Sequence, residues 1–356
     1  MEHHQKLLIT LLKMMVEAGA SDLHLSPNTP PKFRLHGRLQ PAIDQVMSDK
    51  DTEEIMRFLL TKEQKEEVGS EKGDTDAAAT IDGQRFRINV YKTQKGYTIA
   101  IRHLPGKIPS IGQLGLPEKT IVELLSRKDG GIILVTGPTG SGKSTTLASM
   151  IDRINTDHYD HVITIEYPVE YFHEHRNCNI DQRELPIDSP SFPSAVRAAL
   201  REDPDIIMVG EMRDLETIGA ALTAAETGHL VLSTLHTNSA AETINRIIDA
   251  FPKDQQEQVR IQLAHSLLAV ISQRLLPRSD RPGRIAAFEL MKRTDAVANL
   301  IKENKVIQLP STIEIGKQEG MVAFDDSLAN LVRRKIISLE TALQHVHYRK
   351  DFKSRL

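Results

Sequence analysis

Several residue types are scarce in this chain of 356 residues: it has one cysteine, no tryptophan and 4% aromatic residues. Because Cys178 is the only cysteine, neither an internal disulfide nor a four-cysteine zinc site can form, and a reducing, cytoplasmic compartment fits. The low aromatic content argues against a channel in which nucleic-acid bases stack. A translocase acting on nucleic acid therefore stays a minor alternative, and we expect no nucleic-acid partner.

The chain also lacks an excess of charge and a long apolar run. Its 45 basic residues face 48 acidic ones, a net charge of -3, which argues against a surface that tracks nucleic-acid phosphates. No stretch approaches the roughly 18 uncharged apolar residues of a membrane span. The opening segment has apolar residues at helical spacing but is interrupted by Lys13, so it does not resemble a signal peptide. We expect a soluble protein without direct membrane insertion.

The length and the pattern of the chain predict two domains. Residues 1–104 alternate helix-like and strand-like segments, which predicts a compact α+β domain. Residues 105–117 hold three prolines and three glycines and show neither the periodicity of a helix nor that of a strand, which indicates a linker. Residues 118–356 form the second domain.

In the second domain, uninterrupted apolar runs alternate with helix-like segments. This alternation predicts a buried parallel sheet and an α/β fold. The expected strands are residues 131–137, 161–167, 205–211 and 229–236. Beyond about residue 255 we expect mostly helix, with residues 258–276 as the clearest amphipathic segment.

A glycine-rich loop, GPTGSGKS, lies between a strand-like run and a helix-like run at residues 137–144. Glycines in this pattern let backbone N–H groups converge on phosphate oxygens, while Lys143 neutralises charge and the Ser144 hydroxyl holds magnesium. The sequence therefore predicts an ATP site with Mg²⁺. The expected contacts are Gly137, Pro138, Thr139, Gly140, Ser141, Gly142, Lys143, Ser144 and Thr145.

Two other strands end in carboxylates, which hydrolysis requires in addition to the loop. Glu211 ends one strand, where it would face the magnesium ion together with Ser144. Glu166 and Glu170 end another strand, and a carboxylate there can orient a water in line with the γ-phosphate and accept its proton. We favour Glu170 over Glu166 for this role.

Two histidines, His229 and His236, stand at either end of an apolar strand. A histidine in this position can hydrogen-bond the γ-phosphate or a catalytic glutamate and so report the nucleotide state. Because they are seven residues apart on a strand, they cannot form one metal site by themselves. A histidine that fills a polar gap in the core is the alternative for each.

Together, the motifs of residues 137–151, 164–171, 199–238 and 244–252 resemble the secretion ATPase superfamily, in particular the type IV pilus retraction (twitching motility) ATPases of the PilT family. Residues 20–39 resemble that family's PAS-like N-terminal module, and residues 296–328 its C-terminal helical region. The resemblance covers nearly the whole chain. It implies a RecA-like P-loop ATPase domain preceded by a smaller α+β PAS-like domain.

The resemblance also implies an activity and partners. Such proteins are hexameric ring motors that hydrolyse ATP at subunit interfaces and, through an inner-membrane platform protein, drive pilin subunits out of the pilus. The chain would then be cytoplasmic and peripheral to the inner membrane. By position, Glu211 corresponds to the Walker B glutamate, and Arg87 and Arg102 to arginines that reach a nucleotide from the N-terminal module. The acidic box corresponds to Glu166 and Glu170, and the histidine box to His229 and His236.

The chain departs from the family pattern at two places. Tyr167 stands where relatives have an aspartate, which leaves a nucleotide-gated regulator without force production as an alternative. In a helix needed for retraction, Ala298 and Lys302 replace arginines. Pilus assembly relatives carry an extra N-terminal domain and many hold a four-cysteine zinc insert. The length and the single cysteine therefore favour the retraction side, with an accessory retraction paralogue as an alternative.

Overall fold

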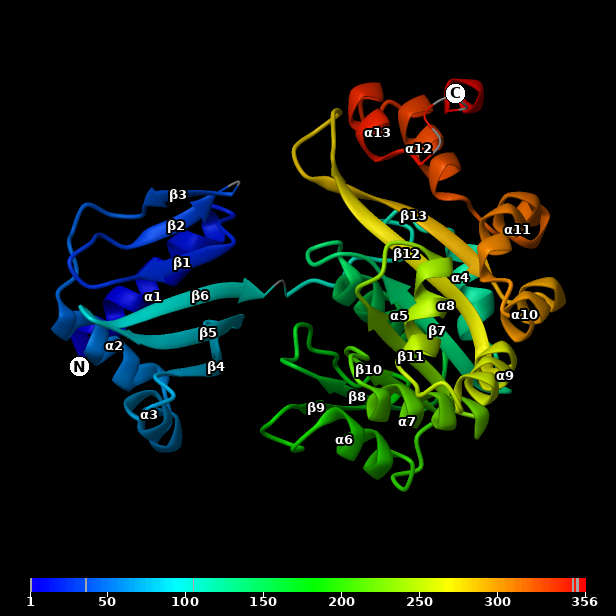
Figure 1. Ribbon diagram of the computed structural model, residues 1–356. Coiled ribbons are helices and arrows are strands. Elements are labelled where there is room, and N and C mark those ends of the chain that lie inside the picture. The colour runs from blue at the N-terminus through cyan, green and yellow to red at the C-terminus, as the bar shows by residue number, and fades with distance from the viewer. Residues whose placement is uncertain (1, 36, 105, 348, 350–351) are drawn as a thin grey trace. The chain divides into compact units, whose positions relative to one another are not determined.

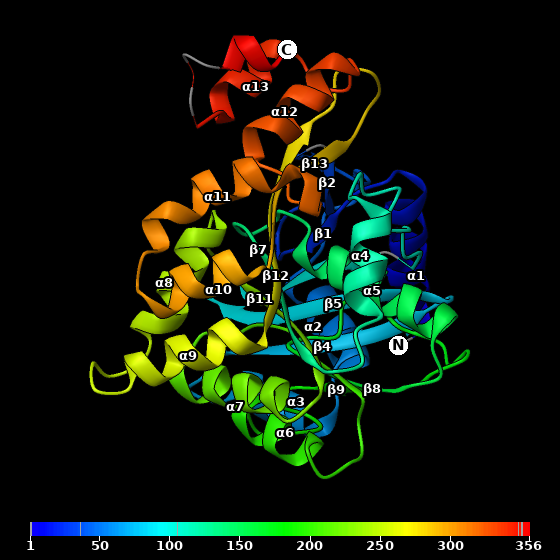
Figure 2. The same ribbon diagram turned by 90° about the vertical axis from the view of Figure 1, so that its right-hand side faces the viewer.

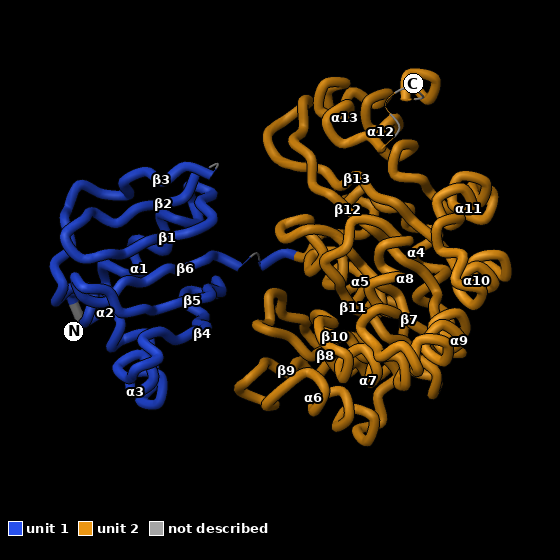
Figure 3. The backbone as a smooth tube through the Cα atoms, in the orientation of Figure 1, with its two compact units in different colours: residues 1–107 blue, residues 108–356 orange. Residues whose placement is uncertain are grey.

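The computed structural model describes residues 2–35, 37–104, 106–347, 349 and 352–356. The chain divides into two compact units, Met1–Lys107 and Ile108–Leu356 (Figure 3). Pro105, expected to open the linker, lies outside the described residues. From Ile108 onward the expected linker belongs to the second unit, in whose core Ile111 and Leu116 are buried.

The first unit is an antiparallel sheet with three helices against one face (Figure 1). The strand order is β3-β2-β1-β6-β5-β4. Alternation along β5 explains the two faces: Phe86, Ile88 and Val90 are buried in the core, while Arg87 and Asn89 point to the other side. The elements are α1 (Glu2–Glu17), β1 (Asp22–Leu25), β2 (Lys32–Leu35), β3 (Arg38–Pro41), α2 (Asp49–Leu59), α3 (Lys62–Gly69), β4 (Asp74–Ile81), β5 (Gln84–Thr93) and β6 (Gly96–Leu104).

The second unit contains a sheet of order β13-β12-β7-β11-β10-β8-β9, in which only the β12–β13 pair, among the described strands, is antiparallel. The strands β7 and β11 are buried along their whole length, which explains their uninterrupted apolar sequences. The strands are β7 (Gly131–Thr136), β8 (His161–Glu166), β9 (Asn179–Glu184), β10 (Ile206–Val209), β11 (Leu230–Leu235), β12 (Leu267–Pro277) and β13 (Arg284–Lys292).

Helices cover both faces of this sheet (Figure 2). Ile133 and Val135 of β7 pack with α4 and α5, whereas Ile132 and Leu134 of the same strand pack with the helices of the other face. The prediction of an α/β domain with a parallel sheet after a smaller α+β domain is confirmed. The helices are α4 (Glu118–Leu125), α5 (Lys143–Asp157), α6 (Phe192–Ala199), α7 (Leu215–Glu226), α8 (Ala240–Asp249), α9 (Gln256–Ser266), α10 (Asp295–Lys302) and α11 (Leu309–Ile315).

The amphipathic helix expected over residues 258–276 is wrong in its second half. Helix α9 ends at Ser266, and the chain continues as the eleven-residue strand β12 between β7 and β13. The run from Leu267 to Ile271 is wholly apolar, and a buried strand and a buried helix segment cannot be told apart by periodicity in such a run. Burial on both faces of the sheet decides for the strand.

The β12–β13 pair reaches a separate small core at its outer end (Figure 1). There Leu276, Ile285 and Ala287 pack against Phe324 and Leu328. The elements of this region are η1 (Val306–Gln308), η2 (Gly316–Glu319), α12 (Phe324–Arg333), α13 (Leu339–His345) and η3 (Phe352–Arg355). Within the described part of the chain, none of the helices combines the length and apolar character that crossing a membrane requires.

Candidate nucleotide site

The glycine-rich loop joins the end of β7 to the start of α5. Gly137, Gly140 and Gly142 have φ values of 145°, 78° and 89°, a region that side chains with a Cβ rarely adopt. At Gly137 a Cβ would also lie 2.2 Å from the main-chain oxygen of Gln273. The loop conformation therefore depends on these glycines, and it opens directly onto the N-terminus of a long helix, where anions are favoured.

Lys143 is a buried cation inside this loop, with 9% of its surface exposed. Its Nζ donates hydrogen bonds to the carbonyl oxygens of Gly137, at 2.9 Å, and Pro138, at 3.2 Å. Desolvation lowers the pKa of Lys143, while the carboxylates of Glu211 and Glu170 act in the opposite direction. The structure thus brings both predicted carboxylates into the electrostatic surroundings of the predicted phosphate-binding lysine, and this cationic loop fits a phosphate group.

Glu211 follows β10 and lies at the carboxyl end of the parallel strands. Its Oε1 is 2.8 Å from Nε of Arg213, and its Oε2 is 3.4 Å from Nε2 of His236. The hydroxyl of Ser144 and the carboxylate of Glu211 are oxygen donors of the class that magnesium prefers. The residues therefore fit a magnesium ion, which would supply charge neutralisation at the phosphates.

Glu166, the last residue of β8, is buried and uses both of its carboxylate oxygens inside the chain. Oε1 accepts hydrogen bonds from Thr164 Oγ1 at 2.8 Å and Gln182 Nε2 at 3.1 Å, and Oε2 accepts one from the backbone N–H of Glu170 at 3.4 Å. Burial raises the pKa of Glu166 to about 7. Because Glu166 is engaged in holding its own loop, the geometry favours Glu170 as the residue that orients a water. This role of Glu170 stays a prediction.

Two residues outside the predicted set hold this acidic loop in place. Gln182 of β9 donates from Nε2 to the carbonyl oxygen of Tyr171 at 2.8 Å, and its Oε1 accepts from the N–H of His173 at 2.9 Å. The hydroxyl of Tyr171 lies 2.9 Å from Oγ1 of Thr145 at the start of α5. Sequence reasoning missed Gln182 because β9, with its charged sequence NIDQRE, gives no strand signal.

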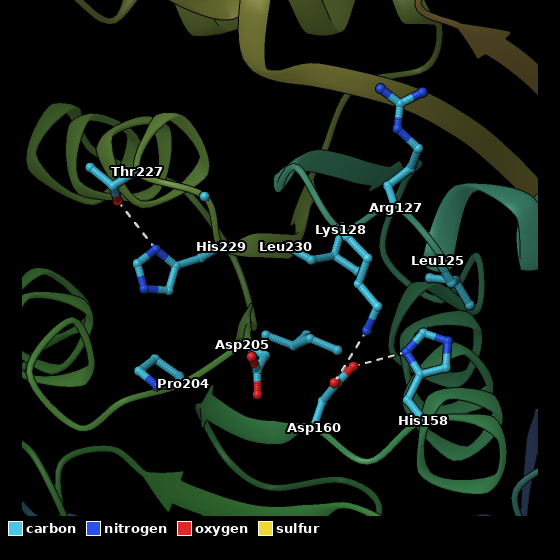
Figure 4. A pocket seen from close by; sticks show the side chains of 12 residues that line it. Leu125, Arg127, Lys128, His158, Asp160, Pro204, Asp205, Thr227, His229 and Leu230 are labelled. Atoms are coloured by element: carbon cyan, nitrogen blue, oxygen red, sulfur yellow. Dashed lines mark hydrogen bonds and ion pairs between the residues drawn. The ribbon is translucent and has the colours of Figure 1, made fainter.

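The two predicted histidines lie at opposite edges of the sheet. His236 is beside Glu211, whereas the carbonyl oxygen of His229 accepts from the N–H of Gly131, the first residue of β7. The His229 side chain is 3.2 Å from Oγ1 of Thr227, and it lines a pocket of about 140 Å³ with Lys128 and the His158–Asp160 pair (Figure 4). Within one chain the structure brings His236, and not His229, to the phosphate loop.

Arg87 and Arg102 lie in the first unit as direct neighbours across the β5–β6 pair. Arg102 donates from Nε to Oδ1 of Asp22 at 2.8 Å, and Arg87 lies 3.7 Å from Asp76. The side chain of Arg102 is 62% exposed and that of Arg87 is 36% exposed, so both remain partly accessible to solvent. A role of either arginine toward a nucleotide stays a prediction.

Comparisons with known proteins bear on this site as a whole. A profile of the family described as "Type II/IV secretion system protein" matches residues 2–342. The chain is 44% identical to the type IV pilus retraction ATPase PilT of Pseudomonas aeruginosa, over 96% of this chain and 98% of that protein. It is also 44% identical to a twitching motility protein of Neisseria gonorrhoeae, over 88% of this chain and 83% of that protein.

Among solved structures, the crystal structure of the pilus retraction motor PilT with bound ADP is similar to this chain, with a TM-score of 0.89 and 44% identity. The similarity covers 97% of this chain and 98% of that one. Both the sequence and the fold thus match over nearly the full length. The chain belongs to the type II/IV secretion ATPases and, within them, to the PilT family of pilus retraction ATPases.

Proposed function

We propose that this protein is an ATP-hydrolysing motor that powers the retraction of a type IV pilus. The observation that carries the proposal is the buried ammonium of Lys143 in the glycine-rich loop, with the carboxylates of Glu211 and Glu170 acting on it. A phosphate-binding lysine, a carboxylate at the metal and a residue that orients the nucleophile are recurring parts of phosphoryl-transfer sites. The other part of the proposal, that hydrolysis drives pilus retraction, rests on the names of the relatives, a pilus retraction ATPase and a twitching motility protein.

In the proposed site, the loop from Gly137 to Thr145 binds the phosphates of ATP, and Ser144 and Glu211 hold Mg²⁺. Glu170 orients the attacking water, and His236, which lies 3.4 Å from Glu211, positions that carboxylate. Arg102, which is exposed, and Arg87, which is partly exposed, act in this proposal at contacts between subunits, together with His229 on the opposite sheet edge. The functional form is a homo-oligomer, a hexamer, as the family resemblance implies.

The proposed motor works in the cytoplasm, at the inner membrane, through a platform protein of the pilus machine. Helix α10, in the C-terminal helical region, is where this chain departs from the family pattern: Ala298 is buried in the core and Lys302 is partly exposed. Because both replace arginines of the family pattern, the coupling of hydrolysis to retraction is expected to differ from that of the relatives.

Lys143→Ala tests the hydrolytic half. The purified variant should lose ATP turnover with magnesium, because removal of the cation leaves the phosphate charge without its neutralising partner. Lys13→Ala is a control, since its side chain is 60% exposed in the first unit and its ion-pair partner, Asp82, is also exposed. Unchanged turnover in Lys143→Ala would overturn the assignment of the site.

The motor half is tested in cells by measuring pilus withdrawal with the wild-type gene, with the gene deleted and with Lys143→Ala. We expect withdrawal to stop in both altered strains. Tight ATP binding with turnover near zero in the purified wild type would instead indicate a nucleotide-gated regulator, and stimulation of turnover by DNA would indicate a nucleic-acid translocase.

A further inference from the structure

A buried glutamine on β12, Gln273, lies directly beside the glycine-rich loop. Strand β12 runs parallel to β7, and Ser272 is the register partner of Thr136, the last residue before the loop. The next residue on β12 is therefore level with Gly137. Gln273 has 2% of its surface exposed, and it belongs to none of the motifs that mark the nucleotide site.

The amide of Gln273 makes a hydrogen bond at each end. Nε2 donates to the carbonyl oxygen of Ser141 at 2.7 Å, and Oε1 accepts from Oγ1 of Thr146 at 3.0 Å. The orientation of the amide follows from chemistry, because a carbonyl oxygen can only accept and so requires the NH₂ group. One side chain thus connects the apex of the loop to the first turns of α5.

The backbone of β12 approaches the loop equally closely. A Cβ on Gly137 would lie 2.2 Å from the main-chain oxygen of Gln273, and a Cβ on Gly142 would lie 3.3 Å from its Nε2. Two glycines of the loop therefore face this one residue. The space that they leave is filled by Gln273, so the glycine pattern and the glutamine form one packing unit.

We propose that Gln273 is a positioning residue for nucleotide binding, which holds the backbone of the glycine-rich loop in its phosphate-binding conformation. The inference rests on the proposed nucleotide site. By fixing the Ser141 carbonyl and the Thr146 hydroxyl, the amide keeps the N–H groups of residues 140–144 convergent. A loop without this support has to be ordered when the phosphates bind, and affinity falls by the free energy of that ordering.

The experiment measures ADP affinity by titration calorimetry with magnesium, ATP turnover and thermal unfolding for Gln273→Met, which keeps the length of the side chain and removes both hydrogen bonds. We expect the Kd for ADP and the KM for ATP to rise roughly tenfold, with a smaller change in kcat. Gln273→Glu keeps the acceptor for Thr146 and places a carboxylate against the Ser141 carbonyl, so it should weaken binding further.

Ser327→Ala is the control for a merely structural effect. Ser327 is buried and its Oγ accepts from the N–H of Phe288, the β13 register partner of Gln273, but it does not touch the loop. This variant should lower the melting temperature and leave the Kd for ADP unchanged. Equal Kd values for Gln273→Met and the wild type, or equal changes in Gln273→Met and Ser327→Ala, would overturn the proposal.

A second pair of variants decides the question if Gln273→Met does not fold. Thr146→Val removes one of the two hydrogen bonds at nearly constant volume, and Thr146→Ser keeps the hydroxyl. We expect weaker ADP binding in Thr146→Val and rescue in Thr146→Ser; equal affinities would contradict the role of Gln273. Lys143→Ala distinguishes failure of the proposed nucleotide site from failure of the proposed role of Gln273, because normal ADP binding in that variant would refute the site itself.

Discussion

The hydroxyl of Tyr171 lies 2.9 Å from Oγ1 of Thr145, and this hydrogen bond joins the acidic loop after β8 to the first turn of α5. Tyr171 has 6% of its surface exposed, and burial raises the pKa of its hydroxyl, which therefore stays protonated at neutral pH. The loop that carries Glu170 is thus connected to the helix that begins with Lys143. The side chains of Tyr171 and Thr145 therefore link the position of Glu170, the proposed water-orienting residue, to that of Lys143.

Tyr171→Phe should loosen this link while preserving the packing of the ring. We expect a loss of about 1 kcal/mol in the free energy of unfolding, and a lower kcat with a smaller change in the Kd for ADP, because Thr145 alone among the predicted phosphate contacts loses a hydrogen-bond partner. Urea denaturation and single-turnover kinetics measure the two effects. Tyr159→Phe is the control, since the side chain of Tyr159 is 84% exposed; equal behaviour of the two variants would contradict the prediction.

Glu166 should make stability depend on pH. Burial raises its pKa from 4.5 to about 7, so between these values the folded chain binds a proton that the unfolded chain has released. Stability from this group is present at pH 4.5 and is lost as the pH rises through about 7. The total loss is expected to be up to about 3 kcal/mol.

The measurement is urea denaturation of the wild type and Glu166→Gln at several pH values between 4.5 and 8. Glutamine cannot ionise, so the difference in unfolding free energy between the two proteins should shift in favour of the variant as the pH rises. A difference that stays constant over this range would show that Glu166 does not titrate there.

Local sequence was enough to predict which residues of the proposed nucleotide site lie at one edge of the sheet, because each of its parts is a short motif. The loop around Lys143 and the carboxylates Glu170 and Glu211 each follow an apolar strand, and the carboxyl ends of parallel strands meet at one edge of the sheet. The strand direction likewise explains why His229, which precedes its strand, lies at the other edge.

The residues that support the site were not predictable in the same way. Gln182 and Gln273 lie on β9 and β12, two strands whose sequences do not show a strand pattern: the first is polar and charged, and the second opens with an apolar run that fits a buried helix equally well. Their partners are also distant, 132 residues away for Gln273 and Ser141. Contacts of this kind depend on the tertiary fold and carry no local signal.

The assignment of the water-orienting residue is tested by comparing Glu170→Gln with Glu166→Gln. Glu170→Gln should bind ATP but hydrolyse it at least about 100-fold more slowly, because an amide does not accept the proton of the attacking water. Glu166→Gln can keep the oxygen that accepts from Thr164 and Gln182 and loses only the longer hydrogen bond from the N–H of Glu170, so it should retain more activity. Single-turnover hydrolysis and ATP binding give both quantities, and the reverse order of activities would assign the role to Glu166.

Glu289 connects the last strand of the sheet to the helix that follows His236. Its Oε1 accepts from the N–H of Ala240, the first residue of α8, at 2.8 Å, and 7% of its surface is exposed. Burial raises the pKa of Glu289, and the charge of Asp325 acts in the same direction. The contact of Glu289 with α8 is this hydrogen bond, which an amide oxygen can also accept.

Glu289→Gln should accordingly be close to neutral, because the amide oxygen still accepts from the N-terminus of α8 without the cost of a buried charge. Glu289→Ala leaves that N–H buried without an acceptor, and we expect a loss of about 1–3 kcal/mol in the free energy of unfolding. Since α8 starts four residues after His236, slower ATP turnover should accompany the alanine variant only. Denaturation and turnover assays of both variants test this, and equal destabilisation by Gln and Ala would mean that the charge of Glu289, and not its hydrogen bond, holds the helix.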